Sequence, residues 1–270
     1  MDFVDKALAR RLESAEEMPQ VHYALAYQKT RPEIGAAAAE IGGGHMVFAG
    51  LGSPIGRAVG MGLDRPLSAE DLDRVEEFYR SHGAPAQVDV CPLHDPALLE
   101  VLKQRGYAMA ELNNVLWRRL RRGGQFLAVP AGVEIRRGRA EEADTFADIV
   151  ARSFHEVNVP EGFHQMLSPL FQMPGAITYV AAVGGKLVAT GAGLIIPEHK
   201  VVALFGAGTL TEFRRRGIQT ALLAERLKLA AEAGCELAVV VTQGGTTSQR
   251  NCERLGFRVA YSKATVVKNL

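Results

Sequence analysis

The chain has 270 residues, of which 47% are hydrophobic and 23% are charged, as in ordinary globular proteins. This length suffices for one large domain or for two of average size. Lys and Arg number 31 and Asp and Glu number 30, so the formal net charge is only +1. No global field would therefore attract nucleic acid or an anionic membrane, and any anion site must depend on a local cluster of charge.

The cysteines and the apolar runs exclude further classes. Cys91, Cys235 and Cys252 are far apart and odd in number, and no CxxC pair occurs. Neither a disulfide framework nor a cysteine zinc site is predicted, and we expect no metal. Residues 1–19 mix acids with apolar residues at helical spacing, which favours an amphipathic helix over a signal peptide. No run of about 18 apolar residues occurs, so we expect a cytoplasmic protein without a membrane segment.

The first half of the chain continues with short elements. We expect a hairpin over residues 46–60, a helix over residues 68–83 and a strand–helix pair over residues 87–107. The glycines in GLGSPIG, residues 50–56, imitate a dinucleotide-binding pattern. Such a pattern must be followed by a helix, and the glycines and proline within residues 60–66 would interrupt one. The dinucleotide interpretation is therefore rejected.

A break in the pattern divides the chain. Turn-forming residues and a charge cluster fill residues 121–132. We therefore expect domains over residues 1–122 and 133–270, joined by a linker over residues 123–132. After the linker the pattern predicts, in order, strand, helix, three strands, helix, strand, helix and strand. This order is typical of an α/β fold with a mixed sheet.

The two halves also resemble each other. Residues 84–120 align on residues 234–270 without a gap, with Gly106 on Gly256. An internal duplication explains this alignment. The alternative is that two α/β halves share a generic strand–helix–strand pattern, because pattern alone is weakly specific.

The segment after the fourth strand of the second half carries the chemistry. Arg214, Arg215, Arg216 and Gly217 precede a helix that starts near Ile218. Backbone N–H groups at a helix start have no intrahelical partner, and the macrodipole makes that end attractive to anions. Glycine lets the backbone come within contact of a phosphate, and each hydrogen bond to a charged group contributes about 1.5–3 kcal/mol. The alternative is a merely exposed arginine cluster, although positive charge there opposes the helix dipole.

Here the sequence resembles a known family. The pattern Arg214-x-x-Gly217-x-Gln219 is similar to the R/Q-x-x-G-x-G/A signature of the GNAT acetyltransferase superfamily, and the element order after the linker matches that fold. The resemblance is strong over residues 133–270 and faint in the first half. It implies two GNAT-like acyl-CoA N-acyltransferase domains in tandem, the first one degenerate. Gln219 departs from the family's Gly or Ala, and its side chain either crowds the cofactor or points away.

The resemblance implies acetyl-CoA as the co-substrate. In the GNAT fold a bulge in the fourth strand splays it from the fifth, and the pantetheine arm lies in the opening. Gly206 and Gly208 fit such a bulge, although both can simply be tolerated glycines. The arm would pair with the backbone of Thr209 and Leu210. The full set of residues expected to bind the cofactor is Gly208, Thr209, Leu210, Arg214, Arg215, Arg216, Gly217, Ile218, Gln219, Thr220 and Asn251.

The catalytic groups follow the family pattern less closely. Acyl transfer from a thioester to an amine needs a neutral amine, a polarised carbonyl and a proton for the departing thiolate. GNAT enzymes commonly place a tyrosine acid shortly before a Gly-Phe pair, and here Cys252 occupies that position. A thiol can donate a proton, but a cysteine on the apolar side of a helix is more often a core residue. Tyr261, Ser248 or solvent are the alternative donors, and Glu156, next to His155, is a candidate base.

The corresponding loop of the first half has a different composition. Residues 64–71, DRPLSAED, contain neither an arginine run nor a glycine. Ser68 followed by Asp71 predicts a capping box that satisfies the helix's own donors. We therefore expect no acyl-CoA binding in the first domain, which would serve as a scaffold or as a wall of the acceptor site.

Taken together, these features favour an N-acetyltransferase that moves an acetyl group from acetyl-CoA to an amine of a small-molecule acceptor. The expected partners are acetyl-CoA and the amine, without nucleic acid or membrane, and a homodimer is left open. One alternative is a non-catalytic acyl-CoA-binding module, suggested by Cys252. Another is a tandem GNAT relative that uses a different acyl donor, such as mycothiol synthase-like or aminoacyl-tRNA-dependent enzymes. The balanced charge argues against tRNA.

Overall fold

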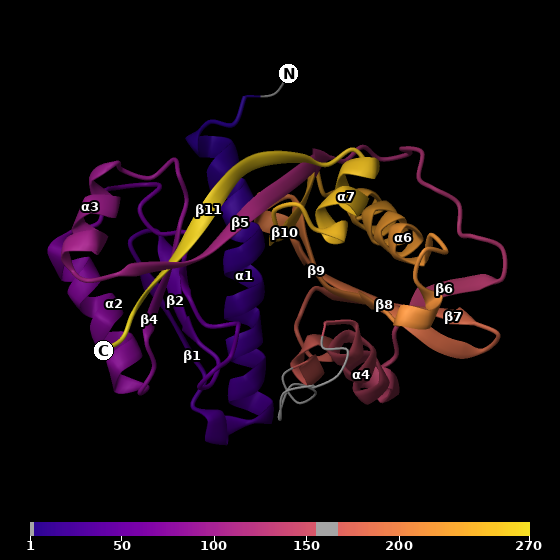
Figure 1. Ribbon diagram of the computed structural model, residues 1–270, viewed down its shortest axis with the longest axis horizontal. Helices are drawn as coiled ribbons and strands as arrows, with labels where there is room; N and C mark the ends of the chain where they lie inside the picture. The colour runs from indigo at the N-terminus through magenta and orange to yellow at the C-terminus, as the bar shows by residue number, and fades with distance from the viewer. Residues whose placement is uncertain (1–2, 155–166) are drawn as a thin grey trace. The chain divides into compact units, whose positions relative to one another are not determined.

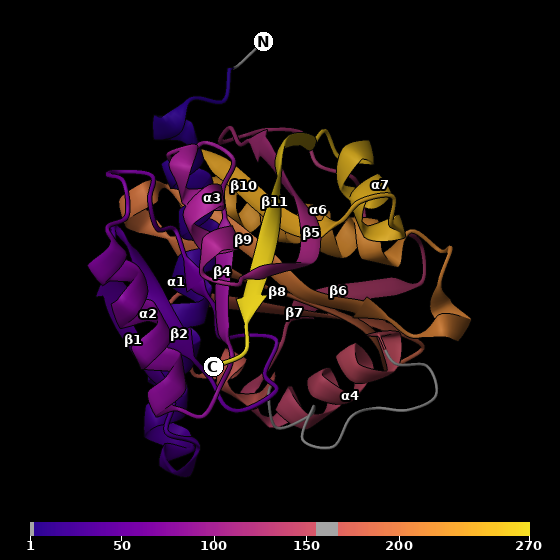
Figure 2. The same cartoon turned by 60° about the vertical axis from the view of Figure 1, so that its left-hand side comes forward.

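The computed structural model describes residues 3–154 and 167–270 (Figures 1 and 2). The chain forms two compact units. Unit 1 contains the described residues up to 116 together with residues 241–246 and 259–270, and unit 2 contains the other described residues. Each unit combines helices with a mixed sheet, which confirms the expected fold class.

Unit 1 has the strand order β1-β2-β3-β4-β11-β5. Neighbours β1–β2, β2–β3 and β4–β11 are antiparallel, whereas β3 and β4 are parallel and are connected through α2. The elements are α1 (Lys6–Thr30), β1 (Ala37–Ile41), β2 (Gly44–Phe48), β3 (Ala58–Val59), α2 (Ala69–Ser81), β4 (Ala86–Val90), α3 (Ala97–Gln104), β5 (Ala108–Arg119) and β11 (Arg258–Lys268), with a 3-10 turn at η1 (Pro32–Ile34).

The alternation of side chains along these strands separates an apolar face from a charged one. Val88, Val90 and Val266 belong to an apolar core that α2 and α3 complete. Asp89 and Lys263 occupy the intervening positions and face α1 instead, where Lys263 pairs with glutamates of that helix. In Figure 1, α2 and α3 lie on one side of the strands of this unit and α1 on the other.

Unit 2 has the strand order β10-β9-β8-β7-β6. Here β10 and β9 are parallel and are connected through α6, and the remaining neighbours are antiparallel. The elements are β6 (Val133–Arg137), α4 (Ala143–Phe154), β7 (Ala176–Val183), β8 (Lys186–Ile196), β9 (Val201–Thr209), α6 (Ile218–Glu232), β10 (Leu237–Gln243) and α7 (Thr247–Arg254), with 3-10 turns at η2 (Ala140–Glu142), η3 (Ser168–Phe171), η4 (Pro197–His199) and η5 (Thr211–Phe213).

Two helices cover opposite faces of the strands of unit 2 (Figure 1). Gly208 of β9 faces α4, because a Cβ there would lie 2.5 Å from the hydroxyl oxygen of Ser153. Gly191 of β8 faces α6, because a Cβ there would lie 2.6 Å from the guanidinium carbon of Arg226. At these two positions glycine lets a helix side chain approach the backbone of the sheet closely.

Several expectations from the sequence are confirmed. The N-terminal segment is the helix α1, and the elements after the linker follow the expected order. Residues 46–60 form two antiparallel strands, β2 and β3, and no helix follows the glycine pattern at residues 50–56. In both units a strand, a helix and a parallel neighbouring strand follow one another, as β3–α2–β4 and as β9–α6–β10.

The limits of the two units do not coincide with the domain boundaries drawn from the sequence. Residues 259–270 of β11 lie in unit 1, where Ala264 pairs with Val90 of β4. Conversely, the end of β5 lies in unit 2, where the Leu120 N–H donates to the Glu236 carbonyl at 2.7 Å. The reason is that an alternating pattern specifies the two faces of a strand but not its neighbours.

No helix of the described residues is long and apolar enough to cross a membrane. Within the same residues, no group of three or more His, Cys, Asp or Glu side chains is arranged to hold a metal ion.

Candidate functional site

The loop between β9 and α6 has two left-handed backbone positions. Arg215 has a φ of 65° and Gly217 a φ of 74°. Left-handed residues beside right-handed ones turn successive N–H groups toward a common point, which makes a concave anion site. The atom nearest to a Cβ built on Gly217 would be Pro130 Cγ, at 3.5 Å. Glycine is therefore favoured at this position by its conformation and not by lack of space.

The start of α6 lacks the side-chain cap that the equivalent helix of unit 1 has. Gly217 is the N-cap residue of α6, no side chain caps it, and no acid lies in the first turn. At the start of α2, by contrast, Ser68 accepts from the Asp71 N–H at 3.1 Å, and Asp71 accepts from the Ser68 N–H at 2.9 Å. The predicted capping box is thus confirmed, and the first-turn N–H groups of α6 stay available for an external anion.

The three arginines of the loop have different surroundings. Arg214 ties the loop to its neighbours, since its side chain donates to the carbonyls of Thr209 at 3.2 Å and Ser153 at 3.1 Å. Arg215 and Arg216 are exposed. The guanidinium of Arg216 lies over the ring of Phe213, 5.1 Å from its centre. Arg214 thus organises the loop, and the other two present their charge to solvent.

Gln219 stands where the family pattern has a small residue. Its side-chain oxygen accepts from the hydroxyl of Thr209 at 3.2 Å. The side chain is therefore held against the end of β9.

The strand before the loop contains the expected bulge. One residue of β8, Gly191, lies opposite two of β9, Gly206 and Ala207, where the register shifts. Gly206 has a left-handed φ of 55°, which glycine adopts without strain. On its other side β9 pairs with β10 only from Val201 to Ala203. Beyond that point the described residues of β9 pair with β8 alone, so part of its backbone is free to pair with something else.

The backbone groups of the two residues named from the sequence are largely occupied. The Leu210 N–H donates to the Val188 carbonyl at 3.0 Å, and the Leu210 carbonyl accepts from the Phe213 N–H at 2.9 Å. The Thr209 carbonyl accepts from Arg214. Any groups left for a ligand must therefore come mostly from the bulged part of β9, before Thr209.

Cys252 is a buried residue of α7 in unit 2. Its side chain is 3% exposed, and burial raises the pKa of its thiol to about 11. A thiol that holds its proton this tightly is a poor donor to a departing thiolate, whose conjugate acid has a pKa nearer 8.5. Asn251, the neighbouring residue, is partly exposed in the same helix.

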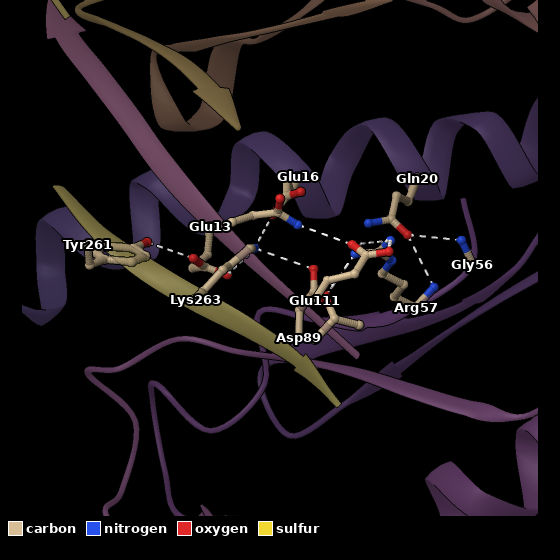
Figure 3. A network of polar contacts seen from close by, with 11 residues as sticks. Glu13, Glu16, Gln20, Gly56, Arg57, Asp89, Glu111, Tyr261 and Lys263 are labelled. Atoms are coloured by element: carbon tan, nitrogen blue, oxygen red, sulfur yellow. Dashed lines mark hydrogen bonds and ion pairs between the residues drawn. The ribbon is translucent and has the colours of Figure 1, made fainter. Parts of the chain in front are cut away.

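Tyr261 lies in unit 1, on β11. Its hydroxyl donates to a carboxylate oxygen of Glu13 at 2.6 Å, and burial together with Glu13 raises its pKa well above the usual value. Lys263 is next on the same face of the strand and pairs with Glu13 at 3.1 Å and with Asp89 at 3.5 Å (Figure 3). Lys263 also contacts Glu16. Tyr261 therefore belongs to a buried polar network of unit 1.

Glu156, the candidate base, lies outside the described residues, as does His155. The structure therefore places the cofactor candidates at the end of β9, in the loop that leads into α6 and, for Asn251, on α7, and it places Cys252 on α7 as well. It places Tyr261 in the buried network of unit 1. None of the three predicted catalytic residues is shown in contact with the loop.

Sequence reasoning missed one charged residue beside the bulge. Arg226 of α6 is 1% exposed, and its guanidinium donates to main-chain carbonyls of the two strands at the bulge. A signal for it exists in the sequence. Ile218, Leu222 and Arg226 are spaced four residues apart, so the helix pattern places the arginine on the same buried face as the two apolar residues.

The glycine pattern of the first half lines a hollow in unit 1. Its volume is about 360 Å³, and Phe48, Arg57, Tyr79 and Glu111 line it together with the loop over residues 50–56. The guanidinium of Arg57 donates to both carboxylate oxygens of Glu111, at 3.1 and 3.0 Å. The glycines thus shape a loop and not a phosphate-binding turn before a helix.

Comparison with known proteins agrees with this architecture. Residues 143–257 match the model of the acetyltransferase (GNAT) family. The structure is similar to a GCN5-related N-acetyltransferase from Kribbella flavida, with a TM-score of 0.65 and 19% identity, covering 92% of this chain and 95% of that one. It is also similar to a tandem GNAT protein from the clavulanic acid biosynthesis pathway, with a TM-score of 0.61 and 16% identity, covering 86% of this chain and 78% of that one.

A third structure, a GCN5-related N-acetyltransferase from Sphaerobacter thermophilus, has a TM-score of 0.55 and 20% identity and covers 74% of this chain and 66% of that one. No curated protein sequence matches the chain significantly. The fold is therefore that of two GNAT-like domains in tandem. The match to the GNAT family model is confined to residues 143–257, whereas the similarity of fold extends over both halves of the chain.

Proposed function

We propose that the protein transfers the acetyl group of acetyl-CoA to an amine of a small molecule. The observation that carries this proposal is the loop Arg214–Thr220 in a GNAT-family domain. Its two left-handed residues and the uncapped helix start after it offer N–H groups to a diphosphate, and two exposed arginines supply charge. The residues expected to bind the cofactor all lie in unit 2, in the loop, in the end of β9 and in α7.

The bulge of β9 supports the same proposal. From Leu204 onward this strand has lost its pairing with β10, as far as the structure describes it. A pantetheine arm carries two amides, and a strand with unpaired N–H and C=O groups is a suitable partner for them. Because Leu210 and the Thr209 carbonyl are occupied within the protein, we place these contacts on residues 204–208 and on the Thr209 N–H.

The first domain would not bind acyl-CoA. Its equivalent helix, α2, is capped by Ser68 and Asp71, and Arg65 is paired with Asp71 at 2.6 Å. An incoming phosphate would have to displace a carboxylate that already fills the anion position. The domain division expected from the sequence, a cytoplasmic location and the lack of a nucleic-acid partner remain predictions.

One test measures acetyl-CoA binding calorimetrically in the wild type and in the double variant Arg216→Glu/Gly217→Val. The variant reverses one charge and puts a β-branched residue at a left-handed position. We expect saturable binding in the wild type and at least about 100-fold weaker binding in the variant, since several charged hydrogen bonds are lost. Arg80→Glu, which reverses an exposed charge in unit 1, is the matched control. Equal affinity in wild type and double variant would contradict the proposal.

A second candidate function is an acyl-CoA-binding module without turnover. Two observations favour it, because both concern candidate proton donors for turnover. Burial raises the pKa of the Cys252 thiol, which makes it a poor acid, and the Tyr261 hydroxyl already donates a hydrogen bond to Glu13. Incubating the protein with acetyl-CoA and a panel of small amines separates the two functions. Release of free CoA above the amine-free background excludes the module. Saturable binding without release from any amine favours it.

A further inference from the structure

Arg226 is a buried cation that carbonyl groups compensate in place of an acid. It is 1% exposed, and no carboxylate forms an ion pair with it in the part of the chain that the structure describes. Its Nε donates to the Leu222 carbonyl of its own helix at 3.1 Å. Burial lowers the pKa of its guanidinium to about 10. A charge held in this way costs free energy, so its position needs a reason beyond filling space.

The guanidinium of Arg226 forms its hydrogen bonds to the strands at the bulge itself. Its terminal nitrogen donates to the Ala192 carbonyl of β8 at 2.6 Å and contacts the Phe205 carbonyl of β9 at 3.5 Å. Ala192 and Phe205 are a cross-strand pair, and the register shift begins directly beside them. One side chain therefore joins both strands at the point where β9 gains its extra residue.

The sheet makes room for this side chain. Gly191, the residue of β8 opposite the bulge, would place a Cβ 2.6 Å from the guanidinium carbon and 2.8 Å from one terminal nitrogen. Any larger residue at this position would force the arginine away. Gly191 and Arg226 are thus matched across the space between strand and helix.

The same helix carries the loop at its other end. Ile218 opens α6 directly after Gly217, and Arg226 lies on the same face two turns further on. At 1.5 Å per residue the guanidinium is attached roughly 12 Å along the axis from the start of the helix. A rigid helix therefore fixes the spacing between the anion-binding loop and the bulge.

On this basis we propose that Arg226 is a positioning residue for the pantetheine arm of CoA: it holds the bulge of β9 in the form that leaves the strand's backbone free to pair with the arm. The inference rests on the proposed function, because it assumes that CoA binds along β9. Arg226 touches the strands and not the ligand, so its effect is selective. It governs affinity for the arm and leaves affinity for the nucleotide half, which the loop binds, unchanged.

The test compares two ligands, CoA and 3′-phospho-ADP, which has the nucleotide and diphosphate but no arm. Calorimetry gives their affinities in the wild type, in Arg226→Met and in Gly191→Ala, which keeps the arginine but displaces it. We expect both variants to bind 3′-phospho-ADP like the wild type and CoA about 10- to 100-fold more weakly, since one or two charged hydrogen bonds that shape the strand are lost. Gly191→Ala decides the matter if Arg226→Met does not fold.

Leu227→Ala is the control, because Leu227 is fully buried in the same helix. It should lower the melting temperature without changing the ratio of the two affinities. A folded Arg226→Met or Gly191→Ala protein with the wild-type ratio overturns the role of Arg226 alone. A wild-type protein that binds neither ligand instead overturns the proposed function, so the two failures are distinguishable.

Discussion

At the scale of single residues, the two lysines on β11 illustrate how surroundings decide the strength of an ion pair. Lys263 and Lys268 both contact acids of unit 1, but the side chain of Lys263 is 3% exposed and that of Lys268 is 26% exposed. Burial alone would lower the pKa of Lys263, yet Glu13, Glu16 and Asp89 raise it well above its ordinary value. Its charge is therefore retained in the folded protein at every physiological pH.

Replacing Lys263 by Met should destabilise unit 1 by about 3–5 kcal/mol, because it leaves buried carboxylates without their cation. Lys268→Met, which removes a partly exposed pair with Glu76, should cost about 1 kcal/mol or less. Urea unfolding at pH 7 gives both values. The Lys263→Met defect should shrink at pH 5, where a carboxylate can take up a proton instead. Equal effects of the two substitutions would contradict this account.

The residues that the sequence could reveal are those with local signals. Arg215, Arg216 and Gly217 form a recognisable pattern because a loop that turns into a helix is specified by a few consecutive residues. Lys263 gave no such signal, since its acids come from α1 and β4, far away in the chain. Arg226 had a helical-spacing signal, but its partners, the carbonyls at the bulge, are set by strand register, which spacing does not reveal.

At the scale of secondary-structure elements, the helix starts differ in whether an acidic side chain caps them. Glu142 closes the 3-10 turn η2, which leads directly into α4. Its carboxylate accepts hydrogen bonds from the Arg136 guanidinium at 2.6 and 2.8 Å and from the Arg139 N–H at 2.9 Å. The start of α2 is closed in a similar way by Asp71. The first turn of α6 has no acid, although three consecutive arginines, Arg214 to Arg216, precede it. Of these three helix starts, two are closed by a carboxylate and the start of α6 is not.

Glu142 provides a pH-dependent test of such a cap. The hydrogen bonds from Arg136 and the Arg139 N–H lower the pKa of Glu142 to about 2, against an ordinary value of 4.5. A lowered acid pKa contributes stability that is present above the ordinary value and is lost as the pH falls toward the folded pKa. Glu142→Gln should therefore cost about 1–2 kcal/mol at pH 7, and the difference from wild type should disappear between about pH 4.5 and pH 2.

The matched control is Glu134→Gln, since Glu134 is a mostly exposed neighbour of Arg136 at 4.0 Å. Denaturant unfolding at several pH values supplies the comparison, and the control should stay within about 0.5 kcal/mol of wild type throughout. A Glu142→Gln difference that is as large at pH 2 as at pH 7 would mean that the carboxylate charge is not what stabilises this turn.

Element type was readable from the sequence where the helical periodicity of apolar residues was strong, as in the helices α2 and α4. The capping box of α2 was readable because both partners lie within four residues. Strand neighbours were not readable. The alternating pattern of β11 fits an antiparallel neighbour in any sheet with one apolar face, so it does not say that this neighbour is β4.

At the scale of the whole molecule, the last strand of the chain makes the two sequence halves dependent on each other. Residues 259–270 complete the sheet of unit 1 and bring Tyr261 and Lys263 to its buried acids. The end of β5 in turn contributes to unit 2, where Trp117 lies beneath the guanidinium of Arg258, 5.1 Å from its ring centre. Two halves that exchange strands in this way depend on each other for folding.

The prediction at this scale is that cutting the chain at the linker does not yield two independent domains. A fragment of residues 1–122 lacks the strand that pairs with β4 and leaves Glu13 and Asp89 buried without Lys263. We expect it to show no cooperative unfolding transition by circular dichroism. Joining residues 257–270 to this fragment through a flexible linker should restore the transition, because edge pairing and the buried cation return together.

The same experiment has an internal comparison. A fused segment that carries Lys263→Met restores the strand without the cation, so it separates hydrogen bonding along β4 from charge compensation. If pairing alone sufficed, both fusions would fold equally well. Glu13 and Asp89 are buried, so we expect the positive charge of Lys263 to be needed as well. The fusion with Lys263→Met should then unfold at a lower temperature than the fusion with the natural segment. A fragment of residues 1–122 that folds cooperatively by itself would show that unit 1 does not need the end of the chain.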